Sequence, residues 1–194
     1  QHFLKNNPQE QEYTKTMISE VDRVNSVITN LLTFARPMAA VRAATNVEEL
    51  IKKAISLTKT DAESKSVDVS VSVQVPGINF LLDENQMLQV LLNLLLNAIQ
   101  AVASNGQIEI GYRIDADKDN LEIWIEDDGI GVPVEKTSKI FEPFFTTREK
   151  GTGLGLSIVH KIVENHGGEI MLQSPPLSKR RGCRFTIIIP GELI

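Results

Sequence analysis

Residues 83–102 read DENQMLQVLLNLLLNAIQAV and combine two different faces on one expected helix. Apolar residues at helical spacing predict a face that packs on the protein core, made of Leu88, Leu91, Leu92, Leu95, Leu96 and Ile99. Uncharged amides at steps of three and four form a polar stripe, made of Gln86, Gln89, Asn93, Asn97 and Gln100. Asp83 is expected to cap the helix, with Gln86 at the reciprocal position of a capping box. The segment therefore predicts a helix that is buried on one side and offers polar groups on the other.

The amides Asn93 and Asn97 are the part of this stripe that suits a ligand. They lie one turn apart on the same side of the helix, so their carbonyl oxygens can converge on one small object. Magnesium bound to nucleotide phosphates needs only one or two protein oxygens, because phosphates and water supply the others. A solvated helix face is the other interpretation of the same stripe, and the helix by itself does not separate the two.

Strand and helix patterns follow one another without regular alternation in the rest of the chain. This order indicates an α+β fold, built as a two-layer sandwich of helices on a mixed sheet. The other expected helices of this layer cover residues 47–57 and 154–165. The expected strands cover residues 67–75, 79–82, 107–113, 121–126, 169–174 and 184–189. Residues 127–153 form a long irregular segment, and loops of this length are commonly functional lids.

A long, bundle-forming helix is expected over residues 12–36, ended by Pro37. Apolar residues recur in it at alternating steps of four and three, at Met17, Val21, Val24, Ile28, Leu31 and Ala35. This spacing is typical of the contact stripe of a helical bundle or coiled coil. The residues that follow, up to Thr45, have no period and are interpreted as a linker. We therefore expect a helical domain over residues 1–40 and a second domain over residues 41–194.

The composition of the chain limits its function classes. A net charge of -5 and an isoelectric point near 5.3 argue against direct binding of nucleic acid, which usually requires a basic face. The single cysteine, Cys183, excludes an internal disulfide and a cysteine-based zinc site. No apolar run approaches the roughly 18 residues of a membrane-spanning helix, so we expect no membrane contact by this chain. Because the chain opens on Gln1 without a signal peptide, we interpret it as a piece of a longer protein.

Two glycine-rich turns flank the irregular segment. Asp127-Asp128-Gly129-Ile130-Gly131 follows a strand, and its glycines let the backbone approach a ligand closely. A carboxylate fixed at the strand end can accept a hydrogen bond from an exocyclic amine such as that of adenine. Gly151-Thr152-Gly153-Leu154-Gly155-Leu156 opens a helix, whose first N–H groups suit a phosphate. The spacing is neither that of a P-loop nor G-x-G-x-x-G, and each turn alone is also typical of an ordinary loop.

Together these segments resemble the sensor histidine kinase family of two-component systems. Asn93 to Ala98 is similar to its N box, Asp127 to Gly131 to its G1 box, Phe141 to Phe145 to its F box, and Gly151 to Gly155 to its G2 box. The string Asn30 to Pro37 resembles the end of the second helix of the family's dimerisation hairpin. Gln100-Ala101 after the N box is most similar to the nitrogen-regulation and metal-tolerance subgroup. The resemblance covers essentially the whole chain.

The resemblance implies a Bergerat-type fold with a site for ATP and Mg²⁺. Asn97 would be the main metal ligand with Asn93 assisting, and Asp127 would bind the adenine amine. Arg148 and Lys150, in the lid, would meet the γ-phosphate; two solvated loop charges are the alternative. Phe141, Phe144 and Phe145 would pin the lid to the body. The remaining residues implied in cofactor binding are Gly129, Ile130, Gly131, Thr146, Thr147, Gly151, Thr152, Gly153, Leu154, Gly155 and Leu156.

The activity implied is transfer of the ATP γ-phosphate to a histidine, for relay to an aspartate of a response-regulator receiver domain. A cytoplasmic location and a homodimer through the hairpin helices are implied as well. One alternative is a hydrolysing ATPase of the Hsp90, MutL and gyrase group. These enzymes carry a glutamate at the position of Asn93 to activate water, and an asparagine cannot accept that proton. The other alternative is a nucleotide-sensing dimerisation module without catalysis.

Two positions depart from the family pattern. The family phosphorylates a histidine within an H-[ED]-x-x-N-P string, and none of His2, His160 and His166 has that context. We therefore expect the acceptor histidine upstream of Gln1, so that this chain alone lacks its substrate. Gly182-Cys183-Arg184-Phe185 stands where the family often has Gly-Thr-x-Phe, which puts a hydroxyl contact to the adenine in doubt.

Overall fold

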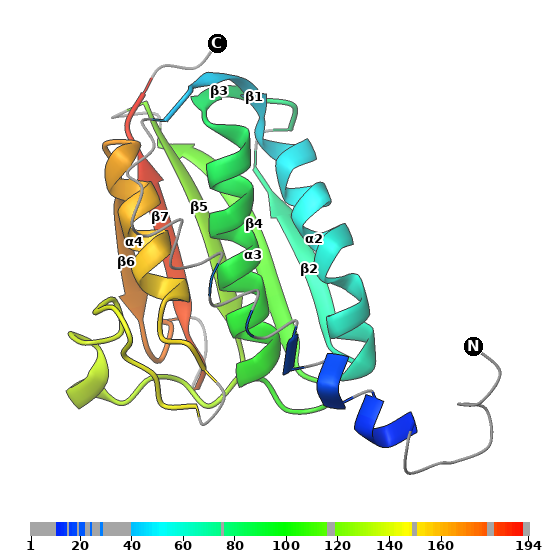
Figure 1. The fold of residues 1–194 in the computed structure, drawn as a ribbon. Helices are drawn as coiled ribbons and strands as arrows, with labels where there is room; N and C mark the ends of the chain where they lie inside the picture. The colour runs from blue at the N-terminus through cyan, green and yellow to red at the C-terminus, as the bar shows by residue number, and fades with distance from the viewer. Residues whose placement is uncertain are drawn as a thin grey trace, which may run out of the picture. The chain divides into compact units, whose positions relative to one another are not determined.

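The computed structural model describes residues 11–14, 16–18, 20, 21, 24, 28, 40–74, 76–115, 119–148, 151–177 and 181–191. The chain divides into two compact units, Gln1–Pro37 and Met38–Ile194, and each is considered by itself. Every described position of the first unit is helical (Figure 1). The four described residues of the expected contact stripe, Met17, Val21, Val24 and Ile28, are exposed. Leu31 and Ala35 lie outside the described residues.

The described residues of the second unit form three α-helices and two sheets (Figure 1). Its elements in chain order are β1 (Ala43–Asn46), α2 (Val47–Ser64), β2 (Asp68–Val73), β3 (Asn79–Leu82), α3 (Glu84–Ala101), β4 (Gln107–Asp115), β5 (Asn120–Asp127), the 3₁₀ turn η2 (Val134–Lys136), α4 (Gly155–Asn165), β6 (Glu169–Gln173) and β7 (Arg184–Ile189). Strands β1 and β3 form an antiparallel pair. The larger sheet has the order β2-β4-β5-β7-β6, and only its β2–β4 pairing is parallel.

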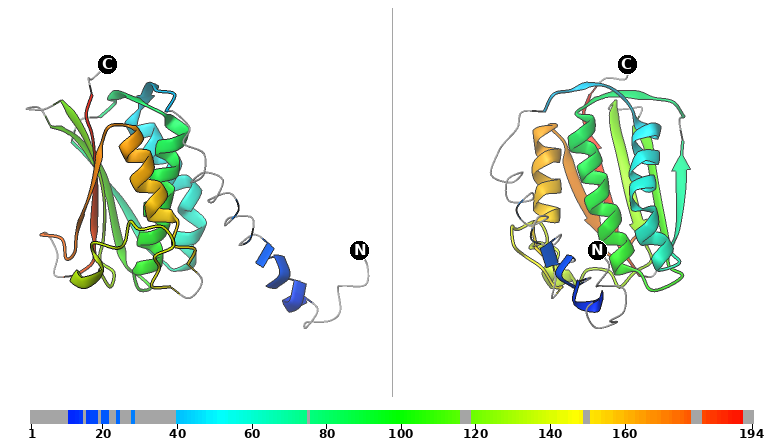
Figure 2. Two further views of the ribbon diagram at one scale, coloured as in Figure 1. Left: turned by 60° about the vertical axis from the view of Figure 1, so that its left-hand side comes forward. Right: turned by 45° about the vertical axis from the view of Figure 1, so that its right-hand side comes forward.

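The three helices cover one face of the larger sheet, which gives two layers (Figure 2). Alternate residues of the central strands point into the helix layer and are buried, as the period of two in a strand requires. These residues are Ile108, Ile110, Tyr112, Leu121, Ile123, Ile125, Phe185, Ile187 and Ile189. The expected α+β sandwich of helices on a mixed sheet is therefore confirmed.

Helix α3 packs between α2 and α4 and is more deeply buried than its sequence predicted. Leu91, Leu95 and Ile99 are buried as expected, whereas Leu88, Leu92 and Leu96 are only partly buried. The rest of the buried face comes from Met87, Val90, Leu94 and Ala98. The predicted apolar face was displaced because a helix with neighbours on both sides buries more of its circumference than a helix with one buried stripe. The amide stripe is what remains partly open.

The N-terminus of α3 is fixed by one expected contact and one unexpected contact. Asp83 Oδ1 accepts a hydrogen bond from the N–H of Gln86 over 3.1 Å, so the expected cap is confirmed. The reciprocal half of the capping box was wrong, because the N–H of Asp83 donates to His166 Nε2 over 3.0 Å. His166 is fully buried at the end of α4, and its Nδ1 lies 2.8 Å from the carbonyl oxygen of Ile162. An accepting Nε2 requires the proton on Nδ1, so this imidazole is neutral.

The segment before α2 differs from the expected linker, because Ala43–Asn46 pairs with β3. This pairing is held close to the cap of α3, since the N–H of Val41 donates to Asp83 Oδ2 over 2.9 Å. Arg42 Nη2 also donates to the carbonyl oxygen of Asn165, at the end of α4, over 3.1 Å. The linker prediction failed because the pairing partner is distant in sequence and leaves no local pattern.

Helix α2 is also longer than predicted, because it continues from Leu57 to Ser64. Its last turns are polar in sequence, but Thr58 and Ala62 are buried on the side that faces the core. The Thr58 hydroxyl donates to the carbonyl oxygen of Ala54 over 3.0 Å, which satisfies it within the helix. Among the described helices, none is both long enough and apolar enough to cross a membrane.

Replacing His166 with glutamine is expected to make the folding stability less dependent on pH. Burial, and then Arg42, lowers the pKa of His166 from its usual 6.5, although the Ile162 carbonyl and Asp83 oppose this. The unfolded chain therefore binds the proton more readily. The stabilising contribution is present above pH 6.5 and is lost as the pH falls through the folded pKa. His166→Gln should cost about 2 kcal/mol near neutral pH and progressively less under acidic conditions.

Urea unfolding of both proteins between about pH 7.5 and 5 measures this difference. His160→Gln is the matched control, because His160 lies on the same helix with 44% of its side chain exposed. A cost of His166→Gln that is constant with pH would contradict the neutral buried imidazole.

Candidate functional site

Asp127 ends strand β5 and is 3% exposed. Its N–H donates to the carbonyl oxygen of Cys183 over 2.9 Å, which extends the β5–β7 pairing to the strand end. Its Oδ1 accepts a hydrogen bond from the N–H of Gly129 over 2.8 Å, so the first glycine turn folds back onto the carboxylate. The sheet thus fixes this acid group at the end of the strand, directly before the first glycine turn, as the sequence predicted.

Glycine is required around Asp127 because other backbone segments lie very close. A Cβ on Gly129 would lie 2.6 Å from the carbonyl oxygen of Ala101, the last residue of α3. A Cβ on Gly182 would lie 1.9 Å from the carbonyl oxygen of Asp127. The N–H of Ile130 also donates to the Ala101 carbonyl over 3.4 Å, while its side chain is 91% exposed. The first glycine turn therefore rests on the C-terminal end of α3.

The end of the first glycine turn contacts the residues that follow β6 and precede β7. Gly131 has a φ of +74°, and a Cβ there would lie 2.9 Å from Ser174 Oγ. Ser174 Oγ accepts from the N–H of Val132 over 2.8 Å and donates to the carbonyl oxygen of Gly182 over 3.0 Å. Ser174 and Gly182 were not among the predicted site residues, since nothing local in the sequence indicates that they meet the first glycine turn.

The second glycine turn connects the lid to α4 and to the amide stripe of α3. Gly153 has a φ of +68°, and a Cβ there would lie 2.3 Å from the backbone carbon of Phe144. A Cβ on Gly155, the first residue of α4, would lie 3.2 Å from Asn93 Oδ1. Thr152 Oγ1 accepts from the N–H of Leu154 over 3.4 Å, and Leu154 is buried. Leu156, also among the predicted residues, is partly buried.

Both asparagines of the stripe face this region with their side-chain oxygens. Asn93 Nδ2 donates to the carbonyl oxygen of Gln89 over 3.0 Å, which fixes the orientation of the amide and turns its Oδ1 toward Gly155. Asn97 Oδ1 accepts a hydrogen bond from Arg148 Nη1 over 2.9 Å. Each amide oxygen is therefore matched with a different predicted segment, one with the second glycine turn and the other with the lid.

Arg148 reaches from the lid to the end of α3. Besides Asn97 Oδ1, its guanidinium donates to the carbonyl oxygen of Asn97 over 3.1 Å and to Gln100 Oε1. Burial lowers the pKa of Arg148 from its usual value, while the nearby carboxylate of Asp127 raises it. Thr146 Oγ1 accepts from the N–H of Arg148 over 3.1 Å. Thr147 is exposed beside it, and Lys150 lies outside the described residues.

Of the three phenylalanines that were expected to pack the lid against the body, two are partly buried and one is exposed. Phe141 is partly buried, with its ring centroid 5.5 Å from that of His160 and 6.4 Å from that of Phe185. Phe145 packs against the core as well. Phe144 was expected to pin the lid but is 63% exposed with a φ of +66°. Its backbone lies against Gly153, so its position is set by the chain path and not by its ring.

Cys183, directly before β7, pairs with Asp127 at the end of β5, and its buried thiol is not suited to acid–base chemistry. Burial, and then the charge of Asp127, raises the pKa of Cys183 to about 11, so the thiol stays protonated. Its Sγ lies 3.7 Å from Ser174 Oγ. A neutral thiol thus stands in the place where the family pattern has a hydroxyl.

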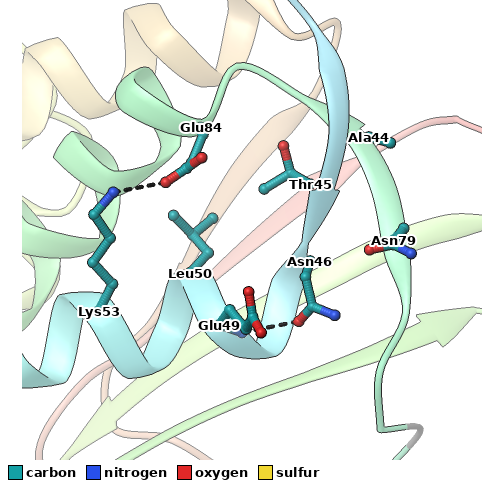
Figure 3. A pocket seen from close by; sticks show the side chains of 8 residues that line it. All are labelled: Ala44, Thr45, Asn46, Glu49, Leu50, Lys53, Asn79 and Glu84. Atoms are coloured by element: carbon teal, nitrogen blue, oxygen red, sulfur yellow. Dashed lines mark hydrogen bonds and ion pairs between the residues drawn. The ribbon is translucent and has the colours of Figure 1, made fainter.

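A separate hollow of about 480 Å³ lies at the other end of α3 (Figure 3). It is lined by Ala44, Thr45, Asn46, Glu49, Leu50, Lys53, Asn79 and Glu84. The Lys53 ammonium forms an ion pair with Glu84 across it, with 2.7 Å between Nζ and Oε1. Asn46 Oδ1 accepts from the N–H of Glu49 and so caps α2. None of the residues predicted to bind a cofactor lines this hollow, so it is not the candidate site.

The comparisons with known proteins agree with this geometry. Residues 82–193 match the profile of the family described as histidine kinase-, DNA gyrase B-, and HSP90-like ATPase. The chain belongs to this family. Within it, sensor histidine kinase ZraS of Escherichia coli (strain K12) is 34% identical over 182 residues, which cover 94% of this chain and 38% of ZraS. The chain therefore spans well under half the length of that kinase.

Solved histidine kinases share the fold of this family member. The catalytic domain of histidine kinase ThkA, in a nucleotide-free form, is 33% identical with a TM-score of 0.70, covering 78% of this chain and 96% of that domain. ThkA in complex with the response regulator TrrA is 28% identical with a TM-score of 0.79, covering 97% of this chain and 53% of that chain. The similarities are to sensor histidine kinases, and they favour a kinase catalytic domain over the alternatives.

Replacing Gly153 with alanine is expected to weaken nucleotide binding by about tenfold or more. The new Cβ would meet the Phe144 backbone at 2.3 Å, so the second glycine turn must shift from its position beside the amide stripe. Gly77→Ala is the matched control, because Gly77 has a φ of +74° but nothing within 4 Å of the added Cβ. Both variants should cost about 1 kcal/mol of stability from backbone strain. Titration with a fluorescent ATP analogue, alongside urea unfolding, measures both effects; equal affinities for the two variants would contradict the role of this turn.

Proposed function

We propose that this chain is the part of a sensor histidine kinase that binds Mg-ATP and transfers its γ-phosphate to a histidine. The observation that carries the proposal is the meeting of α3 with both glycine turns. Ala101 at the end of α3 lies against Gly129, and Asn93 Oδ1 faces Gly155 at the start of α4. A nucleotide bound between the turns would have its adenine near Asp127 and its phosphates near the amide stripe.

Asp127 would bind the adenine through its exocyclic amine. The carboxylate is fixed from two directions, by the strand pairing of its N–H and by the Gly129 N–H on Oδ1. A fixed acceptor costs little entropy on binding. Adenine carries a donor at this position and guanine carries an acceptor, so a carboxylate there favours ATP over GTP.

The stripe of α3 fits a magnesium ion. Asn93 and Asn97 supply neutral amide oxygens, which are hard ligands, and Mg²⁺ bound with a nucleotide takes few ligands from the protein. Asn97 would be the main ligand and Asn93 the assisting one. Bound there, the ion would neutralise phosphate charge during the transfer. The N-terminus of α4, with Gly153 and Gly155 before and at its first turn, would receive phosphate oxygens at its free N–H groups.

Transfer to a histidine is favoured over hydrolysis by the chemistry of Asn93. Its Nδ2 donates to the carbonyl oxygen of Gln89, so the amide is held in place and has no basic atom to take a proton from water. The phosphate would then pass to whichever nucleophile the protein itself presents. Arg148 and Lys150 would bring positive charge to the γ-phosphate from the lid.

The partners and place in the cell follow from the kinase assignment. We propose a homodimer formed through the first unit, supported by the exposed apolar positions Met17, Val21, Val24 and Ile28 at bundle spacing. A receiver domain of a response regulator would take the phosphate from the histidine, and the solved complex of ThkA with the response regulator TrrA supports this partner by analogy. ATP supply requires a cytoplasmic location. The acceptor histidine would lie on the part of the longer protein before Gln1.

The test is a transfer reaction between separate chains. The chain is mixed with Mg²⁺, γ-labelled ATP and a second fragment of the same parent protein that carries the acceptor histidine. Acid-labile label on that fragment is the expected result. Free phosphate without labelled histidine would instead support a hydrolysing ATPase, and neither product would support a nucleotide-sensing module.

Asp127→Asn is expected to weaken ATP binding by about tenfold or more, because the charge-assisted hydrogen bond to the adenine amine is lost. Asp128→Asn is the matched control, since Asp128 Oδ1 accepts from the Gln107 N–H over 3.0 Å and an amide oxygen can keep that contact. Calorimetric titration of both variants with ATP measures the difference. An Asp127→Asn affinity equal to that of Asp128→Asn would remove Asp127 from the site.

A further inference from the structure

At the C-terminal end of α3 the polar stripe carries Gln100, which the proposed function does not use. Its Oε1 accepts a hydrogen bond from Arg148 Nη1, the same nitrogen that donates to Asn97 Oδ1. Arg148 Nη2 donates to the Asn97 carbonyl oxygen over 3.1 Å. These three residues form the Arg148 clamp, in which a lid cation is bound by three oxygens of one helix end. Asn97 and Gln100 are three residues apart and therefore lie on the same side of α3.

The clamp is favoured by the charge at the end of α3. The C-terminal end of a helix carries partial negative charge on carbonyl groups that lack partners in the helix, and a cation there is stabilised. Lys65 binds the same end of α3. Its Nζ donates to the carbonyl oxygen of Ile99 over 2.9 Å and to that of Val102 over 3.0 Å. Lys65 Nζ also donates to the backbone carbonyl oxygen of Gln100 over 3.2 Å. The backbone of Gln100 is thus fixed by one cation while its side chain binds the other.

The backbone of Arg148 makes two hydrogen bonds of its own. Thr146 Oγ1 accepts from the Arg148 N–H over 3.1 Å, and the Gly151 N–H donates to the Arg148 carbonyl over 3.2 Å. A Cβ on Gly151 would lie close to Thr146 Oγ1, so a side chain there would displace the hydroxyl that accepts from the Arg148 N–H. The backbone of Arg148 is therefore bound on both its N–H and its carbonyl while its guanidinium contacts the end of α3.

We propose that Gln100 is a positioning residue that holds Arg148 on Asn97, so that the lid arginine and the nucleotide-bound metal exchange at Asn97 Oδ1. The inference rests on the proposed function, in which Asn97 is the metal ligand. An amide oxygen that accepts from a guanidinium cannot also bind a divalent cation without bringing two positive charges together. Binding of Mg-nucleotide then requires release of Asn97 by Arg148, which frees the guanidinium for the γ-phosphate. The hydrogen bond from Arg148 to Gln100 increases the free energy needed to separate Arg148 from Asn97.

The variant that tests this is Gln100→Met, which removes the acceptor and keeps length and helix propensity. Gln100 is exposed, so the substitution leaves the core intact. The affinity for ADP in the presence of Mg²⁺ should increase by about threefold to tenfold, the effect of losing one exposed charge-assisted hydrogen bond. The affinity for ADP with the metal chelated should stay unchanged, because Asn97 Oδ1 is then not needed. ADP is used because it has no γ-phosphate for Arg148 to bind.

Gln89→Met is the matched control, since Gln89 belongs to the same stripe but lies three turns before Gln100. Trypsin cleavage after Arg148, followed by mass spectrometry without nucleotide, gives a readout that does not depend on ATP. It should be faster in Gln100→Met than in the unmodified chain and in Gln89→Met. Gln100→Lys, which places a like charge beside Arg148, should shift both measurements in the same direction and further.

The outcomes separate the two proposals. If the unmodified chain binds no ADP under any condition, the nucleotide site itself is wrong and the exchange falls with it. If it binds Mg-ADP but Gln100→Met leaves both the metal dependence and the cleavage after Arg148 unchanged, the positioning role is overturned while the nucleotide site stands. Equal weakening of binding with and without Mg²⁺ would also overturn it, because a purely structural residue acts in that way.

Discussion

Helix α3 is constrained at both ends and along most of its circumference, and the candidate site depends on that constraint. Its first turn is capped by Asp83, whose own N–H is bound by the buried His166 of α4. Its last carbonyls are bound by Lys65 and by the turn after β5. Its sides pack on α2 and α4. The amide stripe remains partly open, so residues that packing does not use are available there to meet a ligand.

This constraint also explains why the glycines are needed where they are. Both glycine turns must approach α3, one at Ala101 and one at Asn93, and a Cβ at Gly129 or Gly155 would come within 2.6 Å or 3.2 Å of those residues. The two turns are joined through the lid, whose Arg148 returns to the same helix. A ligand between the two turns would therefore be surrounded by segments that all contact helix α3. Contact with one rigid helix keeps the geometry of a site that is built mostly from loops.

Local sequence patterns predicted the elements well, because helix caps and strand alternation depend on near neighbours. The Asp83 cap, the strand at 184–189 and the asparagines of the stripe all follow from such patterns. Several of the failures share one cause, which is a partner distant in sequence. The N–H of Asp83 was assigned to Gln86 but binds His166, and the linker before α2 pairs with β3. Arg148 was placed in the lid, yet its contact with Gln100, 48 residues away, has no local signature.

Amide hydrogen exchange, with and without Mg²⁺ and a non-hydrolysable ATP analogue, tests the location of the site most directly. We expect protection at residues 127–132 and 151–156 and in the C-terminal half of α3. The amides of the residues that line the hollow with Lys53 and Glu84, at the other end of that helix, should exchange at the same rate in both conditions. Protection centred on residues 44–53 and 79–84, or no protection at the two glycine turns, would contradict it.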